Sequence, residues 1–392
     1  MKKLFARIYQ KILYIVMLFI KFREPIILDN YQKLVEVLNK NNKKHIMLLS
    51  GKRVSKEGFY QELYILLNNN FNVLTYTDIP SDPDIESIEN AVVVAKEHSC
   101  DAVVAIGGGS TMDAAKAVAA RLNNPNQSLR QMRGIIRIRR KPVFLVAIPT
   151  TAGTGSECTV ASVVSDLENK EKYAISDPKL IPIYAVLNPK CILTLPKELL
   201  ATTALDALTH AVEAYLGCSN TKETKQKAIS ACRNIFNNLE FAYKNLDDLE
   251  SRRLLQIASY DAGIAFTKAY VGYVHAFSHA IAAYYHLPHG YLNGIILPIV
   301  LESYGEVINK KLVTLLTSTN IDNSDPNNFI IYIKNLLVSL NIQNNLCDII
   351  KDEDIPKMIA HIKKEVYPLY PVPRYFSDEE LLIIFNKLRN IA

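Results

Sequence analysis

The stretch Asp101-Ala-Val-Val-Ala-Ile-Gly-Gly-Gly-Ser110 joins a short apolar run directly to three consecutive glycines. The apolar run predicts a buried parallel strand, and the helical spacing of 112–122 predicts a helix soon after the turn. Such a turn lets the backbone approach a phosphate, and the helix N-terminus adds unpaired N–H groups. The predicted nucleotide-binding turn consists of Gly107, Gly108, Gly109 and Ser110. Because the spacing is not the G-x-G-x-x-G fingerprint, a simple tight turn is the alternative.

Apolar runs and helical patterns alternate on both sides of this turn. Repeated strand–helix units of this kind predict one parallel α/β sheet with right-handed crossovers. The expected strands are 45–50, 71–76, 101–106, 143–148 and 184–187, and the expected helices are 55–69, 84–99 and 112–122.

A threonine-rich loop follows the expected strand 143–148. Thr150, Thr151 and Thr154 supply hydroxyl groups there, and the loop is too rich in Gly and Thr to continue a sheet. Ligands of open α/β sheets bind at the carboxyl ends of the strands, so this loop and the glycine turn are expected to face one crevice. An ordinary turn is again the alternative.

The expected strand 45–50 ends at Gly51, which we count among the cofactor-binding residues, and Lys52 and Arg53 follow. An acidic residue at such a position binds the ribose 2′-OH and disfavours a 2′-phosphate. These four residues, 50–53, contain two cations and no acid. The sequence therefore predicts that NADP(H) is either tolerated or preferred over NAD(H), and a tenfold preference for NAD(H) would refute this. The alternative is that the two cations are merely solvated.

Strand patterns disappear near residue 195. Four long segments with apolar residues at helical spacing follow, at 198–216, 222–243, 247–268 and 291–309. We predict three parts: a basic and apolar helix at 1–24, a nucleotide-binding α/β domain at 25–195 and an all-helical domain at 196–392.

Five candidate metal ligands occupy two short stretches of the helical half. Asp206 and His210 are four residues apart, as are His275 and His279, so each pair lies on one helix face. His289 follows ten residues later. One carboxylate with three imidazoles would suit Fe(II) or Zn(II), although a single helical histidine is more often structural.

Length and composition describe an ordinary globular protein. The chain has 392 residues, of which 49% are hydrophobic, and a net charge of +6 that is too small to indicate nucleic-acid binding. The six cysteines form no C-x-x-C pair. This pattern favours reduced thiols in a cytoplasmic protein.

The N-terminus combines lysine and arginine with the apolar run Ile12–Ile20. The run is too short to span a bilayer, and no small-residue cleavage site follows it. We expect a helix that packs on the protein, with attachment to a membrane surface as the alternative.

Taken together, four motifs resemble the iron-containing (group III) alcohol dehydrogenases. These motifs are Gly-Gly-Gly-Ser-x-x-Asp-x-x-Lys at 107–116, Pro-Thr-Thr-Ala-Gly-Thr-Gly-Ser-Glu at 149–157, Asp-Ala-Leu-Thr-His-Ala-Val-Glu-Ala-Tyr at 206–215, and His-x-x-x-His with Pro-His-Gly beyond it at 275–290. The resemblance implies a Rossmann-like N-terminal domain, an all-α C-terminal domain and a cleft between them. It also implies a homodimer.

The resemblance assigns residues to roles. It implies metal ligands at Asp206, His210, His275 and His289, and it makes His279 a non-ligand near the substrate, which we take as the catalytic candidate for proton transfer. The implied cofactor site contains Gly108, Gly109, Ser110, Asp113, Thr150, Thr151 and Lys172.

The expected activity is reversible hydride transfer between a primary alcohol and NAD(P), assisted by Fe(II) or Zn(II). The partner is then a small alcohol or aldehyde, and no nucleic acid is expected. Two alternatives stay open: a metal- and NAD-dependent lyase resembling the dehydroquinate synthases, and a binding protein without activity. Net production or consumption of NAD(P)H distinguishes the dehydrogenase from the lyase, and the intact ligand set and glycine turn argue against the binding protein.

Overall fold

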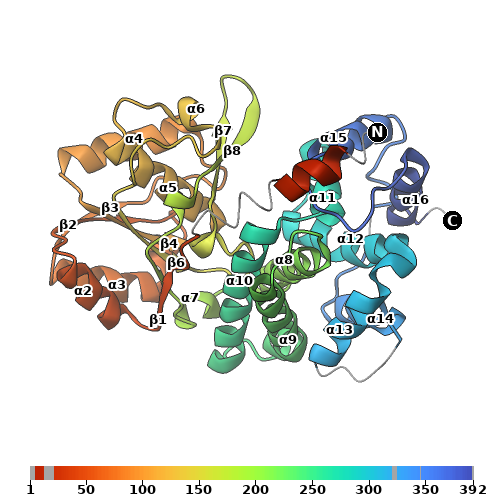
Figure 1. Cartoon of the computed structure of the whole chain (residues 1–392). Helices are drawn as coiled ribbons and strands as arrows, with labels where there is room; N and C mark the ends of the chain where they lie inside the picture. The colour runs from red at the N-terminus through yellow and green to blue at the C-terminus, as the bar shows by residue number, and fades with distance from the viewer. Residues whose placement is uncertain (1–4, 13–21, 320–324, 345, 391–392) are drawn as a thin grey trace. The chain divides into compact units, whose positions relative to one another are not determined.

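A computed structural model describes residues 5–12, 22–319, 325–344 and 346–390. The chain divides into two compact units, Lys21–Leu195 and Pro196–Ala392, and the second unit includes the short N-terminal helix at 5–12 (Figure 1). The rest of the helix predicted at 1–24 falls largely outside the described residues. Within the described part, no helix has the length and apolar content needed to cross a membrane.

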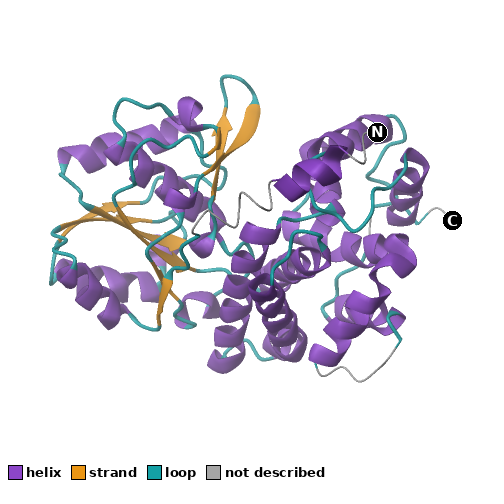
Figure 2. Ribbon diagram, viewed as in Figure 1, coloured by secondary structure: helices purple, strands orange, loops and turns teal. Residues whose placement is uncertain are grey.

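A six-stranded sheet with only parallel pairs forms the centre of the first unit, which confirms the predicted fold class (Figure 2). The strand order is β1-β9-β6-β4-β2-β3. The strands are β1 (Ile26–Leu28), β2 (His45–Leu49), β3 (Asn72–Tyr76), β4 (Ala102–Gly107), β6 (Phe144–Pro149) and β9 (Tyr184–Val186).

Both faces of this sheet are covered by helices. Successive side chains of a strand point to opposite faces, so Ile46 and Leu48 belong to one hydrophobic cluster while Met47 and Leu49 belong to the other. The first cluster includes residues of α2 and α3, and the second includes residues of α4 and α5. These helices are α2 (Tyr31–Lys40), α3 (Gly58–Asn68), α4 (Ile85–Glu97) and α5 (Gly109–Asn123).

Helix α5 begins at Gly109, three residues before the predicted start at 112. Gly108 is its extended N-cap, and the amide of Met112 donates to the Gly108 carbonyl at 3.1 Å. The pattern misplaced this start because glycine is a weak helix former. As a result, the glycine run itself supplies the first unpaired N–H groups of the helix.

A second, three-stranded sheet was not predicted. It contains an antiparallel hairpin of β7 (Ala161–Asp166) and β8 (Glu171–Ser176), with β5 (Gly134–Ile135) beside β8. Buried and exposed residues alternate along β8, but β7 buries its last three residues in succession, so only one of the two strands has an alternating pattern.

Among the residues of the second unit that the structure describes, all regular structure is helical, as predicted. The helices that follow α7 (Lys190–Leu193) are α8 (Lys197–Leu216), α9 (Lys222–Lys244), α10 (Leu249–Ala269), α11 (Tyr273–Tyr285), α12 (His289–Tyr304), α13 (Asn309–Ser318), α14 (Asn327–Ser339), α15 (Ile355–Val366) and α16 (Asp378–Leu388).

The predicted helix 291–309 is shifted. Helix α12 starts at His289 and ends at Tyr304, where Gly305 adopts a positive φ of 62° and a 3-10 turn continues the chain to Ile308.

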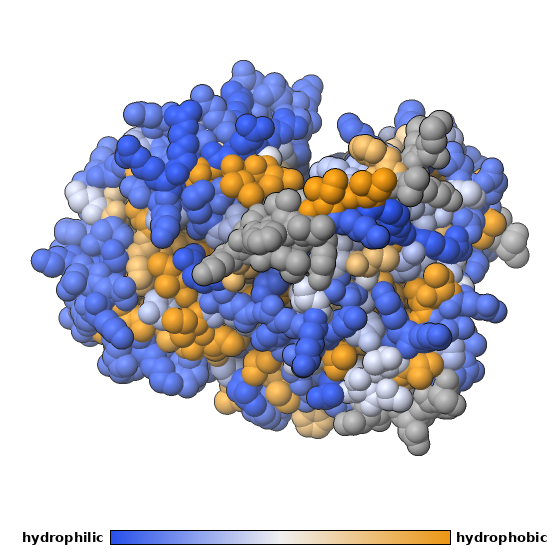
Figure 3. All heavy atoms as spheres, viewed as in Figure 1, coloured by the Kyte–Doolittle hydropathy of each residue, from blue (hydrophilic) through white to orange (hydrophobic). Residues whose placement is uncertain are grey.

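Polar side chains dominate the visible molecular surface, and apolar side chains reach it in scattered patches (Figure 3).

Candidate active site

Helix α8 carries the first two candidate ligands. Asp206 and His210 are one turn apart on it, and both side chains are buried. The helix extends over 20 residues rich in alanine and leucine, which are strong helix formers, and it begins directly after Pro196. Its middle is therefore a rigid support for the two side chains.

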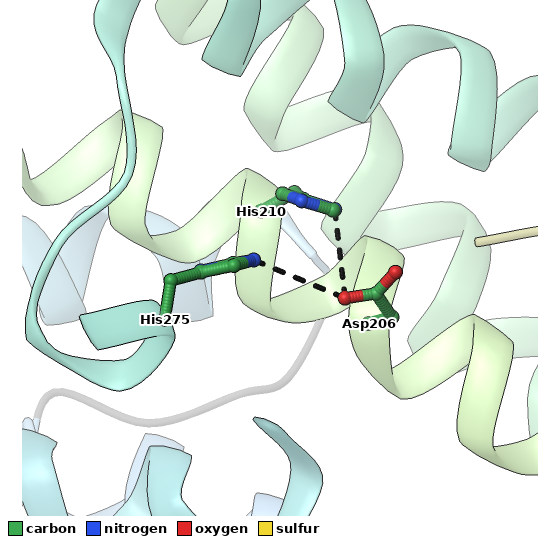
Figure 4. Close-up of side chains that lie close together, drawn as sticks. All are labelled: Asp206, His210 and His275. Carbon is green, nitrogen blue, oxygen red and sulfur yellow. Dashed lines mark ion pairs between the residues drawn. The ribbon is translucent and has the colours of Figure 1, made fainter. Parts of the chain in front are cut away.

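His275 in the first turn of α11 joins this pair. Its Nε2 atom lies 3.9 Å from Asp206 Oδ1, and His210 Nδ1 lies 3.9 Å from the same oxygen. The candidate ligand atoms of the three residues all lie within 4.8 Å of one another. Figure 4 shows both imidazoles directed toward the Asp206 carboxylate, and their rings stack with centroids 4.4 Å apart.

His289 approaches the same carboxylate from the start of α12. Its Nε2 atom lies 3.4 Å from Asp206 Oδ1, although its side chain is 37% exposed. It falls outside the compact group of three, but its ring centroid is only 5.4 Å from that of His275. Desolvation lowers the pKa of His289 to about 4, which keeps the imidazole neutral.

The spacing of these atoms fits a divalent cation. Ligand atoms at ~2.1 Å from a tetrahedral ion lie about 3.4 Å apart, close to the 3.4 and 3.9 Å found here. The amide Nδ2 of Asn293 also lies 2.7 Å from Asp206 Oδ1, 3.1 Å from His289 Nε2 and 3.3 Å from His275 Nε2. Three of the four candidate ligand atoms thus converge on one electropositive group.

Two buried residues of this site were not singled out from the sequence. Asn293 lies four residues after His289 on α12, so helical spacing could have identified it. The carboxylate of Glu213 accepts hydrogen bonds from His275 Nδ1 at 2.7 Å and from the amides of Gly272 and Val274 at 2.8 and 2.7 Å. No local sequence signal relates Glu213 to His275, because the two are 62 residues apart.

The bond to Glu213 sets the role of each nitrogen in His275. Burial lowers the pKa of His275 well below its usual range, and the neighbouring histidines lower it further. A neutral His275 that donates through Nδ1 presents the lone pair of Nε2 toward Asp206. Burial raises the pKa of Glu213 to about 7, while its two backbone N–H bonds lower it.

His279 lies at the edge of the histidine cluster, not in the compact group. Its Nδ1 atom is 2.7 Å from Glu365 Oε1, and its ring stacks on that of His289 at 5.1 Å. The side chain is 43% exposed. Burial lowers the pKa of His279, but the bond to Glu365 outweighs this and the pKa is raised overall.

In the first unit, the glycine turn packs against the threonine loop. The Thr150 amide donates to the Gly107 carbonyl at 2.9 Å. A Cβ at Gly109 would lie 2.9 Å from Thr154 Cγ2, and one at Gly108 would lie 3.5 Å from Thr151 Cγ2. The two loops therefore lie side by side, and residues 108–110 remain partly exposed; that the loops face one ligand-binding crevice stays a prediction.

Asp113 forms hydrogen bonds within the protein, next to the glycine turn. Its carboxylate accepts from Ser156 Oγ at 2.8 Å and from the Val163 amide at 3.1 Å. The buried Lys116 donates to Ser156 Oγ, Thr159 Oγ1 and the Ala161 carbonyl. These bonds tie α5 to the threonine loop and β7, so the contact of Asp113 with a cofactor stays a prediction.

The other two predicted cofactor residues, the exposed Lys172 and the partly exposed Gly51, have acidic neighbours. Lys172 on β8 donates to Asp82 at 2.7 Å. Gly51 forms an isolated bridge with Asp78, whose carboxylate lies 2.9 Å from Lys52 Nζ. The tertiary structure thus places Asp78 beside the end of β2, where residues 50–53 contain no acid. Of the two cations there, Lys52 is paired with Asp78.

Comparisons with known proteins agree with the motifs. The family model for iron-containing alcohol dehydrogenase matches residues 27–189, and the model for the C-terminal part of the Fe-containing alcohol dehydrogenase family matches residues 200–388. Among curated proteins, alcohol dehydrogenase 4 of Saccharomyces cerevisiae is 34% identical over 82% of this chain and 85% of its own length. A probable alcohol dehydrogenase of Escherichia coli, EutG, is 34% identical over 78% of each chain.

Solved structures share the fold over nearly the whole chain. A 1,3-propanediol oxidoreductase matches with a TM-score of 0.88 and 27% identity, covering 94% of this chain and all of its own. An alcohol dehydrogenase from Oenococcus oeni matches with a TM-score of 0.87 and 26% identity, covering 94% of this chain and 99% of its own. Family models over both halves, together with the buried Asp206–His210–His275 group, establish that this chain belongs to the iron-containing alcohol dehydrogenase family of oxidoreductases.

Proposed function

We propose that this protein is a metal-dependent, NAD(P)-linked alcohol dehydrogenase that also works as an aldehyde reductase. The convergence of Asp206, His210, His275 and His289 on one point supports the proposal most directly. The proposed ion is Fe(II), with Zn(II) as the alternative, because both suit one carboxylate with three imidazoles. The names of the relatives support a small alcohol or aldehyde as substrate.

When bound, the cation supplies Lewis-acid chemistry toward the alcohol oxygen, and the nicotinamide accepts the hydride. The protein's residues prepare the two groups. Glu213 orients His275, and Asn293 donates to Asp206 and so fixes the direction of its carboxylate. His279 lies beside the ligand cluster and is the proposed relay for the hydroxyl proton, with Glu365 holding its Nδ1 atom.

The proposed dinucleotide site lies on the first unit. Gly107, Gly108, Gly109 and Ser110 supply a close backbone approach and the N-terminus of α5, and the neighbouring loop adds Thr150, Thr151 and Thr154. Gly51, Asp113 and Lys172 are its further proposed contacts. Since Arg53 is exposed and the four residues that follow β2, 50–53, contain no acid, we propose that both NADH and NADPH are used.

The domain division at 25–195 and 196–392 belongs to the same proposal, with the nucleotide on the first domain and the metal on the second. We further propose a cytoplasmic homodimer, on the strength of the family resemblance. Light scattering on the purified protein tests the dimer, which should have twice the mass of the 44.1 kDa chain.

The decisive test measures oxidation of NADH and of NADPH with a panel of aldehydes, on protein of known metal content. We expect turnover in proportion to bound metal, and both metal and turnover should be lost together in His275→Ala. A metal-free variant with full turnover would contradict the assignment. Formation of a product without net consumption of reduced cofactor would instead favour a lyase of the dehydroquinate synthase type.

A further inference from the structure

The N-terminal helix at 5–12 contacts the rest of the second unit through its polar side. Gln10 is 5% exposed and Ala6 is buried, whereas the apolar side chains of Phe5, Ile8 and Ile12 are exposed, Ile8 to 50%. A surface helix normally buries its apolar face. Hydrogen bonds therefore account for the position of this helix better than apolar burial does.

These hydrogen bonds all reach the connection between α15 and α16. The amide Nε2 of Gln10 donates to the carbonyls of Pro368 and Tyr370 at 2.9 and 2.8 Å and to the hydroxyl of Tyr375 at 2.7 Å. Arg7 donates through Nη2 to the carbonyls of Val372 and Pro373 at 2.8 and 3.1 Å.

Arg7 and Gln10 also support each other. The Arg7 guanidinium donates through Nη1 to Gln10 Oε1 at 3.1 Å, and it lies over the ring of Tyr375, 5.0 Å from its centroid. The two side chains thus act as one unit. They donate to four backbone carbonyls of a segment, 367–377, that has no helix or strand of its own, and the Tyr370 carbonyl among them also accepts from the Val372 amide at 2.9 Å.

The same connection also contacts Glu365, the residue of α15 that hydrogen-bonds with His279. Tyr370 is nearly buried, and its hydroxyl donates to Glu365 Oε1 at 2.7 Å. That oxygen is also the acceptor for His279 Nδ1, at 2.7 Å. A continuous path therefore leads from Gln10, through the backbone and hydroxyl of Tyr370, to Glu365 and the ring of His279.

We propose that the helix at 5–12 is a positioning element of the active site, in which Gln10 and Arg7 hold Tyr370 and Glu365 so that the ring of His279 keeps its orientation. This inference rests on the proposed role of His279 in alcohol dehydrogenation. It assigns a task to an N-terminal segment that the metal and nucleotide sites do not use. Gln10, Tyr370 and Glu365 are positioning residues, because they act through His279.

The test compares Gln10→Ala and Tyr370→Phe with the control Ile8→Ser, which changes the exposed side of the same helix. Misplacing a group by about 1 Å costs up to ~100-fold in rate, and we expect kcat to fall about tenfold in the first two variants. The KM for the cofactor and the metal content should not change, and Ile8→Ser should match the wild-type protein.

A double-mutant cycle separates positioning from a general structural role. In a His279→Ala background, Gln10→Ala and Tyr370→Phe should lower kcat no further, because the residue through which they act is gone. Full additivity in that background, or an unchanged kcat in a folded Gln10→Ala variant, would overturn the proposal. Tyr370→Phe keeps the ring and leaves the N-terminal helix untouched, so it tests the path even if Gln10→Ala folds poorly.

A measurement without turnover makes the result independent of the proposed activity. The Nδ1–H proton resonance of His279, assigned by its absence in His279→Ala, should shift in Gln10→Ala and Tyr370→Phe and stay in place in Ile8→Ser. Amide hydrogen exchange of 367–377 should also become faster in Gln10→Ala. An unshifted resonance would refute the positioning role even if the wild-type protein proved to be inactive as a dehydrogenase.

Discussion

Replacing Glu213 by glutamine tests how the metal centre is built. The carboxylate is buried and faces three donors, namely His275 Nδ1 and the amides of Gly272 and Val274. Glutamine has almost the same shape, but it offers one acceptor oxygen and one amide group that is itself a donor. At least one of the three donors must then lose its partner.

The expected loss follows from these contacts. Removing the partner that orients a metal-bound histidine typically costs 10- to 100-fold in metal affinity, which is about 1.4–2.8 kcal/mol at 1.4 kcal/mol per factor of ten. A buried donor left without an acceptor costs a further ~1–3 kcal/mol of folding stability. We expect Glu213→Gln to lower both metal affinity and the melting temperature of the metal-free protein.

Competition with a chelator of known affinity measures the metal term, and thermal melting of the metal-free protein measures the stability term. Glu198→Gln is the matched control, since this glutamate is exposed in the first turn of the same helix. If Glu213→Gln bound metal within twofold of the wild-type protein, the carboxylate would not orient His275 as argued here.

Three further outcomes are expected. Gly109→Ala would bring a Cβ to 2.9 Å from the Thr154 methyl group. This variant should have a higher KM for the dinucleotide and lose ~1–3 kcal/mol of stability. The control Gly58→Ala, whose Cβ would meet no atom within 4 Å, should change neither quantity. Arg53→Ala should lower kcat/KM with NADPH about tenfold through a lost bond to phosphate and leave NADH kinetics unchanged; equal losses with both cofactors would refute this. The bond from Arg130 holds the pKa of Asp166 well below its usual range, so the ionised carboxylate stabilises the fold above its unfolded-state pKa of ~3.9. The melting temperature of Asp166→Asn should therefore be lower than that of the wild-type protein at pH 7, with the difference shrinking as the pH falls below about 4.

Much of the fold was predictable because its signals are local. Apolar runs such as 45–50 and 143–148 are buried on both faces of a parallel sheet, and they became β2 and β6 with boundaries shifted by one residue. The hairpin β7–β8 was missed because its stability depends on pairing between strands, not on the pattern of either strand alone.

The sequence by itself determined which residues could build the active site. A spacing of four residues on a predicted helix paired Asp206 with His210, and the glycine run indicated a helix directly after the turn, although its predicted start was three residues late. Only the tertiary structure decided what surrounds these residues. Glu213, Glu365 and Gln10 meet their partners across 62, 86 and 358 or more residues of chain. Helical periodicity extends over a few turns, whereas the orientation of a buried imidazole depends on whichever donor or acceptor the folded chain brings to it.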